Sequence, residues 1–335
     1  MRWLILGGCP RSGTTGLMDS LNQDPNIGLI PEYNSGRLFQ MADAFFYKEQ
    51  NVKRKSWVGD INLNTRGDAT VLTKRFIKYV PQKDRTRDHI IETLYKTTFG
   101  KDCKLFGEKF PLYWNIDIDY VIDAVTKVQI IQILRNPRDV IRSYLHRRWL
   151  KMNNRDIWPY TEPEEGFRHW IAAWEALEHF SGDQRLELLP IKYEDLLTKD
   201  APYEQIGTFL NLDSTRFQRL EKGKPREDTN LDVTFEYDHE IEAVFGNLLN
   251  DWNEPLTDLL VRYPPNRLRD NFERVFKTPF DIAQPAGLSS GDLLDTLVRH
   301  SKNYHKRAPK SFRRSLSKRA HKALKHINGW RRKPA

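Results

Sequence analysis

The chain has 335 residues, of which 39% are hydrophobic and 12% aromatic, a length and composition that suit one large globular domain or two smaller ones. Its apolar runs stay below the ~20 residues that span a bilayer, and the apolar stretch at 3–6 is too short for a signal-peptide core, so we expect neither a membrane span nor a secretion signal. Cys9 and Cys103 are the only cysteines and offer neither a disulfide framework nor a zinc spacing, which indicates a cytoplasmic location.

Charge separates the end of the chain from the rest. Residues 300–335 contain 13 Lys and Arg and no Asp or Glu, which leaves 41 of the 54 basic residues beside all 45 acidic ones in 1–299. The body of the protein is therefore slightly acidic, and the formal net charge of +9 belongs to the final segment.

Short apolar runs alternate with helical patterns along the chain, which is typical of βαβ units around a parallel sheet. Strands are predicted at 3–6, 27–30, 104–107, 128–134 and 186–191. Helices are predicted at 14–22, 37–47, 68–79, 116–125, 138–152 and 167–180. We therefore expect an α/β fold with three layers, α/β/α, and a central parallel sheet.

The sequence changes character after Pro285. Glycine and serine are frequent at 287–291, and a short helical pattern precedes the basic end of the chain. We predict one domain over 1–285, a linker with a short helix over 286–299, and a basic tail over 300–335.

Residues 8–15 read Gly-Cys-Pro-Arg-Ser-Gly-Thr-Thr and lie between the first predicted strand and its helix. Backbone N–H groups of such a turn converge on one point, and the helix N-terminus adds partial positive charge, so the segment predicts a phosphate-binding loop of the P-loop type. An ATP-binding loop would place Lys where Thr14 stands, and here the only cation in the loop is Arg11. The loop suits a terminal phosphate with a further anionic group better than a magnesium triphosphate.

At 10–15 the chain resembles the sulfotransferases that use 3′-phosphoadenosine-5′-phosphosulfate (PAPS), whose loop is Pro-Lys/Arg-Ser-Gly-Thr-Thr. A second family element, a strand-end Arg followed eight residues later by Ser, is similar to Arg135 and Ser143. The resemblance implies that this pair binds the 3′-phosphate, for which a guanidinium fork and a hydroxyl are suitable. It also implies that the loop binds the 5′-phosphosulfate through Arg11, Ser12, Gly13, Thr14 and Thr15.

Sulfuryl transfer needs a base for the acceptor hydroxyl and a cation at the departing oxygen. Cytosolic members of the family carry a His two residues after a Lys, whereas residues 107–111 read Gly-Glu-Lys-Phe-Pro. The chain therefore looks more like the carbohydrate and tyrosyl-protein branches, which implies Glu32 as the base. Lys109 would then stabilise the bridging oxygen and Arg11 the sulfuryl oxygens. Glu108 remains an alternative base.

Three further residues correspond to nucleotide contacts of the family. Tyr193 follows the last predicted strand, and Lys222 and Lys224 lie in a glycine-containing segment similar to a loop that closes over PAPS. Clustered carboxylate, His or Cys ligands are lacking in the sequence, so we expect no metal cofactor.

The candidate residues share one position in the predicted topology. Residues 8–15, 31–32 and 108–109, together with Arg135 and Tyr193, each follow a predicted strand. In an open parallel sheet ligands bind beyond the carboxyl ends of the strands, so we expect these groups to meet at one edge.

These observations predict a sulfotransferase that moves a sulfuryl group from PAPS to a hydroxyl, with a glycan or glycolipid as the expected acceptor. Two alternatives stay open: a P-loop nucleoside or adenylylsulfate kinase, and a non-catalytic nucleotide-binding module that acts through its basic tail. The missing loop lysine and the Arg135–Ser143 pair speak against the kinase.

In the basic tail, apolar residues recur at steps of three or four, which is typical of an amphipathic helix. They are Phe312, Leu316, Ala320, Leu324, Ile327 and Trp330. Such a helix can bind an anionic membrane surface peripherally, or it can pack on its own domain or on a second subunit. The apolar stripe suits an interface better than nucleic acid, so we expect no specific nucleic-acid partner.

Overall fold

The computed structural model describes residues 1–32, 102–116, 118–153, 162–221 and 236–280, with isolated positions between 35 and 96. These residues belong to one compact unit, formed by 1–58 and 73–285. A second unit, formed by 59–72 and 286–335, lies outside the described residues, as do the predicted linker and basic tail. The helices predicted at 37–47 and 68–79 also lie outside them, apart from position 39.

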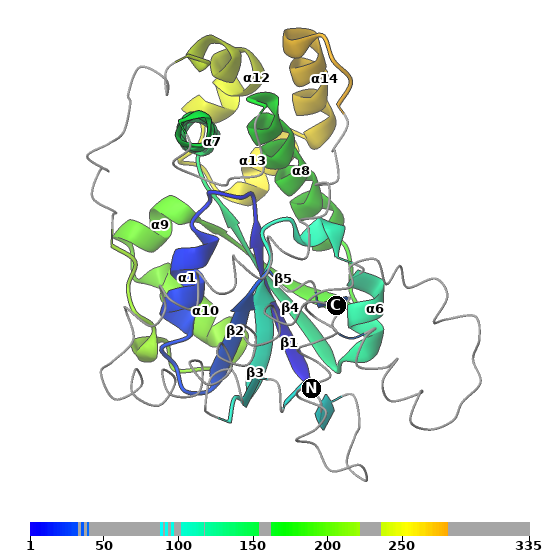
Figure 1. The fold of residues 1–335 in the computed structure, drawn as a ribbon, viewed down its shortest axis with the longest axis vertical. Coiled ribbons are helices and arrows are strands. Elements are labelled where there is room, and N and C mark those ends of the chain that lie inside the picture. Colours follow the sequence, from blue (N-terminus) through cyan, green and yellow to red (C-terminus); the bar gives the residue numbers. More distant parts are fainter. Residues whose placement is uncertain are drawn as a thin grey trace, which may run out of the picture. The chain divides into compact units, whose positions relative to one another are not determined.

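Five parallel strands form one sheet in the order β2-β3-β1-β4-β5 (Figure 1). The strands are β1 (Arg2–Gly8), β2 (Ile27–Pro31), β3 (Leu105–Lys109), β4 (Lys127–Leu134) and β5 (Leu186–Lys192). β1 and β4 are buried along almost their whole length, which is why their sequences read as continuous apolar runs. The predicted parallel sheet is confirmed.

Two of the predicted strands extend further than their apolar runs. β3 continues through Glu108 and Lys109, which were expected to follow it, because these residues pair with Ile5 and Leu6 of β1. The neighbouring strand β2 likewise includes Pro31, opposite Lys109. The apolar pattern placed the ends of β2 and β3 too early, because residues without apolar side chains can still pair with the neighbouring strand through their backbone.

Helices cover both faces of the sheet. On one face lie α1 (Thr14–Leu21), α9 (Tyr193–Thr198) and α10 (Ala201–Leu210), and on the other lie α6 (Ile118–Ala124) and part of α8 (Glu164–Ser181) (Figure 1). Alternate residues of β1 supply the two cores: Leu4 and Leu6 pack with Leu17 of α1, whereas Trp3 and Ile5 pack with Val121 of α6. The three-layer arrangement is the expected one.

A helical cluster stands beyond the carboxyl end of the sheet. It joins α7 (Pro137–Met152) and α8 to α12 (Asp238–Asn250), α13 (Leu256–Arg262) and α14 (Pro265–Phe276) (Figure 1). Trp170 and Trp174 stack within this cluster at a centroid distance of 5.3 Å and are fully buried. These tryptophans therefore belong to the core.

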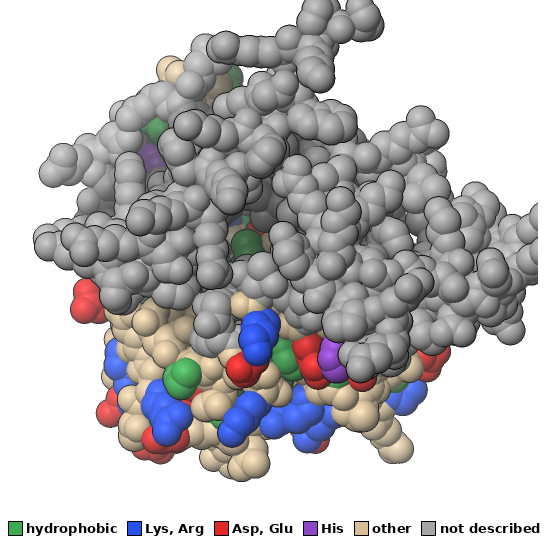
Figure 2. Space-filling view, turned by 60° about the horizontal axis from the view of Figure 1, so that its bottom comes forward, with side chains coloured by type: hydrophobic (Ala, Val, Ile, Leu, Met, Phe, Trp, Pro, Cys, Tyr) green, Lys and Arg blue, Asp and Glu red, His purple; other side chains and the backbone are tan. Residues whose placement is uncertain are grey.

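Charges of both signs intermingle on the described surface at the amino ends of the strands (Figure 2). Lys127 pairs with Glu187 at 2.6 Å, and Arg185 pairs with Asp119 at 2.7 Å. Among the residues described, none of the helices has the length and apolar character that crossing a bilayer requires.

Candidate active site

The loop between β1 and α1 has a backbone that its glycines permit. Gly8 has φ +133°, and a Cβ there would lie 2.2 Å from the carbonyl oxygen of Ile133. Gly13, the N-cap residue of α1, has φ +93°, and a Cβ there would lie 2.3 Å from the ring of Tyr193. Only glycine fits both positions, so the loop can lie close against β4 and the first residue of α9.

The end of this loop suits an anion. The N-terminus of α1 has no side-chain cap and no acidic residue in its first turn, so its backbone dipoles stay available to a ligand. Ser12 is fully buried, and its Oγ has no hydrogen-bond partner in the described part of the chain. A buried hydroxyl beside a helix N-terminus fits a phosphate or sulfuryl oxygen as partner.

The second predicted anchor lies against the loop. Arg11 Nε donates to Ser143 Oγ at 3.0 Å, and Arg135 Nη1 donates to the carbonyl oxygen of Arg11 at 3.3 Å. The guanidinium of Arg135 also lies 5.0 Å from the ring centroid of Tyr193. Four candidate residues that are far apart in sequence therefore meet at one edge of the sheet.

Lys109 and Glu32 form an ion pair at the ends of β3 and β2. The Lys109 side chain is 7% exposed, whereas the Glu32 side chain is 47% exposed and can be reached from solvent. Glu32 N donates to the carbonyl oxygen of Lys109 at 2.7 Å. Since Leu6 pairs with Lys109, the ion pair lies directly beside the strand that leads into the loop.

Two of these residues have left-handed backbone conformations, Arg11 with φ 73° and Glu32 with φ 51°. Such conformations cost non-glycine residues about 1–3 kcal/mol and concentrate at functional sites. Both belong to the residues for which catalytic roles are predicted.

Glu108 has a different environment from Glu32. It is fully buried, and its Oε1 accepts a hydrogen bond from Ser35 N at 2.5 Å. This carboxylate therefore holds the backbone that follows β2.

A hydrogen-bonded group of three side chains lies behind the loop. Burial raises the pKa of the Cys9 thiol well above its ordinary value, while a hydrogen bond with Tyr144 opposes this rise. The Tyr144 hydroxyl lies 3.0 Å from Nδ1 of His169. Burial, with a smaller effect of the Arg168 charge, lowers the pKa of His169 to about 4. The Cys9 thiol and the His169 imidazole are therefore uncharged at neutral pH, and together with Tyr144 they link the loop, α7 and α8.

Some functional contacts were not predicted from the sequence. Trp170 Nε1 donates to the carbonyl oxygen of Arg135 at 2.9 Å, and Glu194 Oε1 accepts from Asn136 N at 2.9 Å. The Asn136 side chain caps α7, with Pro137 in the first helical turn. The dipeptide Asn-Pro before a helical pattern is a recognisable start signal, whereas the contacts of Trp170 and Glu194 leave no mark in the sequence.

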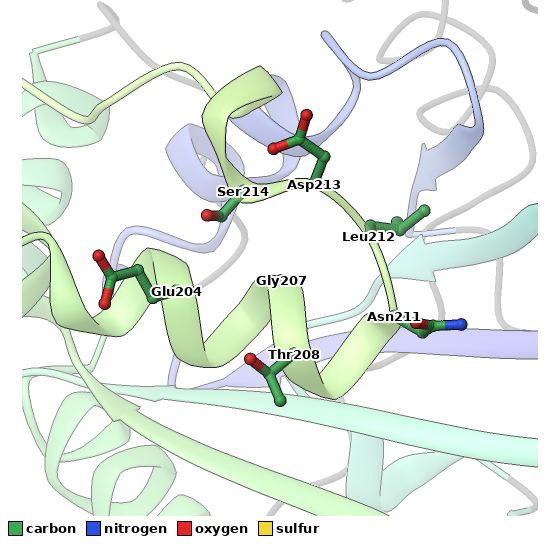
Figure 3. Close-up of a pocket in the computed structure, with 7 residues that line it drawn as sticks. All are labelled: Glu204, Gly207, Thr208, Asn211, Leu212, Asp213 and Ser214. Atoms are coloured by element: carbon green, nitrogen blue, oxygen red, sulfur yellow. The ribbon is translucent and has the colours of Figure 1, made fainter.

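Other features lie apart from this edge or outside the described residues. Lys222 and Lys224 belong to 222–235, which the structure does not describe. An open depression of about 650 Å³ lies between α10 and the turn after it, where Glu204 and Asp213 contribute carboxylates (Figure 3). The end of α10 lies at the opposite edge of the sheet, because Arg2 of β1 donates to the carbonyl oxygen of Leu210. In the described residues, groups of side chains that could hold a metal ion are lacking.

A parallel sheet with a glycine-containing loop, two arginines and a lysine at its carboxyl edge defines an α/β protein whose candidate site is rich in cationic side chains. The model of the sulfotransferase family matches residues 4–216, and the chain belongs to this family. It is therefore a sulfotransferase, an enzyme that transfers a sulfuryl group. The helices α12 to α14 lie beyond the matched residues.

Three of the solved structures to which this chain is similar are described as sulfotransferases. The sulfotransferase domain from the curacin biosynthetic pathway has 18% identity and a TM-score of 0.42, with 88% of this chain and 96% of that chain covered. The sulfotransferase domain from the Synechococcus PCC 7002 olefin synthase has 15% identity and a TM-score of 0.42, with 89% and 94% covered. A sulfotransferase from Alicyclobacillus acidocaldarius has 19% identity and a TM-score of 0.37, with 76% and 97% covered. No curated protein matches the chain significantly.

Proposed function

We propose that the protein transfers the sulfuryl group of PAPS to a hydroxyl of a carbohydrate or glycolipid. The observation that carries this proposal is the contact of Arg11 with both Ser143 and Arg135 at the end of the phosphate-binding loop. Two cations and a hydroxyl within one set of hydrogen bonds suit a ligand with anionic groups at two positions.

The donor would bind along the sheet edge. The N-terminus of α1 and Ser12 would hold the 5′-phosphosulfate, and Arg135 with Ser143 would hold the 3′-phosphate. Arg11 lies in the phosphate-binding loop and also donates to Ser143, so its side chain is suited to contact both the 5′-phosphosulfate and the 3′-phosphate of the donor. Tyr193 supports Arg135 with its ring and limits the space beside Gly13.

Glu32 and Lys109 would carry the chemistry. Glu32 accepts the proton of the acceptor hydroxyl while the acceptor oxygen forms a bond to sulfur and the bond from sulfur to the bridging oxygen breaks. Lys109 stabilises the charge that develops on the departing 5′-phosphate. The ion pair between the two side chains keeps the acid–base group and the cation adjacent before substrate binds.

The environments of the two carboxylates favour Glu32 as the base over Glu108. The side chain of Glu32 is half exposed, whereas Glu108 is enclosed and holds Ser35 N. We expect Glu32→Gln to lower the turnover of radiolabelled PAPS by about 10²-fold or more with an unchanged affinity for 3′,5′-ADP. Glu108→Gln is expected to lower the unfolding temperature and to keep measurable turnover. Full turnover in Glu32→Gln together with loss in Glu108→Gln would reverse the assignment.

Ligand-dependent thermal unfolding tests the donor. Stabilisation by 3′,5′-ADP and not by ATP with magnesium is expected for a PAPS-dependent enzyme. Stabilisation by ATP alone would support a kinase, and no shift with either would support a non-catalytic module. The acceptor class is tested by transfer of ³⁵S from PAPS to glycolipids, free sugars and phenols. Labelling of phenols alone would contradict the carbohydrate proposal.

A further inference from the structure

The peptide unit that joins β4 to α7 is held from both sides. Its carbonyl oxygen, that of Arg135, accepts from Trp170 Nε1, and its N–H, that of Asn136, donates to Glu194 Oε1, both at 2.9 Å. A peptide unit is planar, so hydrogen bonds at both of its polar atoms fix its rotation about the chain axis. The side chain of Arg135 leaves the backbone directly beside this fixed plane.

The carboxylate of Glu194 is itself fixed by a second donor. Trp252 Nε1 donates to Oε2 at 3.2 Å, and this indole is 5% exposed. Lys192 Nζ in turn donates to the main-chain oxygens of Trp252 and Glu254 and lies 5.2 Å from the indole centroid. The two donors to Glu194, Asn136 N and Trp252 Nε1, each need an acceptor, and the two carboxylate oxygens supply both. A glutamine amide cannot replace the carboxylate, because its NH₂ group would face one of these N–H groups.

The position of this plane matters for the geometry of the anion site. Beyond it, Asn136 caps α7 and Pro137 occupies its first turn, and the helix then carries Ser143. A rotation of the plane would move the guanidinium of Arg135 away from Tyr193 and the carbonyl oxygen of Arg11 while Ser143 stayed with the helix. The distance between the two groups that face the 3′-phosphate would then change.

We propose that Glu194 is a positioning residue that aims Arg135 and thereby gives the site its selectivity for a 3′-phosphorylated nucleotide. This inference rests on the proposed function, in which Arg135 binds the 3′-phosphate. The selectivity is expressed as the ratio of the dissociation constants of 5′-AMP and 3′,5′-ADP. Trp252, which lies beyond the residues matched by the family, donates to this carboxylate from the segment between α12 and α13.

Calorimetric titration of full-length variants tests the proposal. Glu194→Gln is expected to lower the ratio about tenfold by weakening 3′,5′-ADP binding, with 5′-AMP binding unchanged. Asp195→Asn is the matched control, because Asp195 is on the same helix and pairs with the exposed Lys199 at 2.7 Å. It is expected to keep the ratio of the wild type. Combining Glu194→Gln with Trp252→Phe removes the opposing N–H, and the ratio is expected to recover in part.

The Arg135→Ala variant separates a failure of this inference from a failure of the proposed function. If the wild type binds both nucleotides equally and Arg135→Ala changes nothing, the proposed function is wrong and the inference falls with it. If Arg135→Ala abolishes the selectivity but Glu194→Gln keeps it and lowers only the unfolding temperature, Glu194 is merely structural and the inference is overturned. Support requires that Glu194→Gln has no further effect on the ratio in the Arg135→Ala background.

Discussion

Acidification from pH 7.5 to pH 5 is expected to destabilise the protein through His169. Its imidazole is 3% exposed, and its pKa falls from 6.5 to about 4 because burial disfavours the charged form. A base whose folded pKa is lowered contributes stability above its unfolded pKa and loses it as the pH falls toward the folded pKa. The loss therefore occurs between about pH 6.5 and pH 4.

The magnitude follows from these two pKa values. At pH 5 the unfolded chain is almost fully protonated at this position, while the folded chain is almost fully neutral. The difference corresponds to about 2 kcal/mol at pH 5 and to roughly 3 kcal/mol below pH 4, at about 1.4 kcal/mol per pH unit. This contribution is a large part of the free energy of unfolding, which is ~5–15 kcal/mol for native proteins.

Urea unfolding at pH 7.5 and pH 5 measures this contribution. The double variant Tyr144→Phe/His169→Phe removes both partners of the buried hydrogen bond, so no polar group of the pair is left without a partner. Its loss of stability between the two pH values is expected to be about 2 kcal/mol smaller than that of the wild type. His179→Gln, at an exposed position of the same helix, is expected to retain the full loss. Equal losses in the wild type and the double variant would refute the reasoning.

Three other predictions concern the loop, the chemistry and the tail. Gly13→Ala is expected to weaken 3′,5′-ADP binding strongly, because the new Cβ would lie 2.3 Å from the Tyr193 ring and the backbone has φ +93°. The control Gly182→Ala, whose Cβ would have its nearest atom at 3.9 Å, is expected to bind 3′,5′-ADP normally, and equal affinities of the two variants in titration would contradict this prediction. Lys109→Met is expected to lower kcat by about 10²–10³-fold with 3′,5′-ADP affinity kept, and single-turnover kinetics that match the wild type would exclude its role at the bridging oxygen. We propose that 300–335 binds anionic membranes, so sedimentation with anionic vesicles is expected for the full chain and not for a chain without this segment; equal sedimentation would rule this out.

Local patterns in the sequence predicted the sheet, because buried parallel strands need continuous apolar runs. The run at 128–134 became β4 almost unchanged. The meeting of Arg11, Arg135 and Ser143 was also predictable, since the carboxyl ends of parallel strands share one edge.

The C-terminal helices were not predicted, although the signals were present. The helix α14 begins with Pro265 in its first turn and buries Leu268 and Phe272 four residues apart. By contrast, the contact of Glu194 with Trp252 spans 58 residues and joins a side chain to a side chain. No periodicity or spacing records such a contact, because it depends on where the segment between α12 and α13 lies relative to α9.

The order of the strands explains how a chain with scattered site residues forms a directional site. Along the carboxyl edge, β2 leads into Glu32, β3 ends at Lys109, β1 leads into the phosphate-binding loop and β4 leads into Arg135. In the proposed function the first of these positions holds the base and the second holds the cation at the bridging oxygen. The third binds the 5′-phosphosulfate and the fourth binds the 3′-phosphate.

Neighbouring strands lie about 4.8 Å apart, so the three steps from β2 to β4 span roughly 14 Å. Neighbouring roles in the transfer therefore fall on neighbouring strands, and no long loop is needed to bring the base to the donor. In the proposed function the acceptor would approach from the β2 side, because the loop and Arg135 lie toward the other end of the edge. With these proposed roles, donor recognition and acceptor chemistry are separated by strand position along one sheet edge.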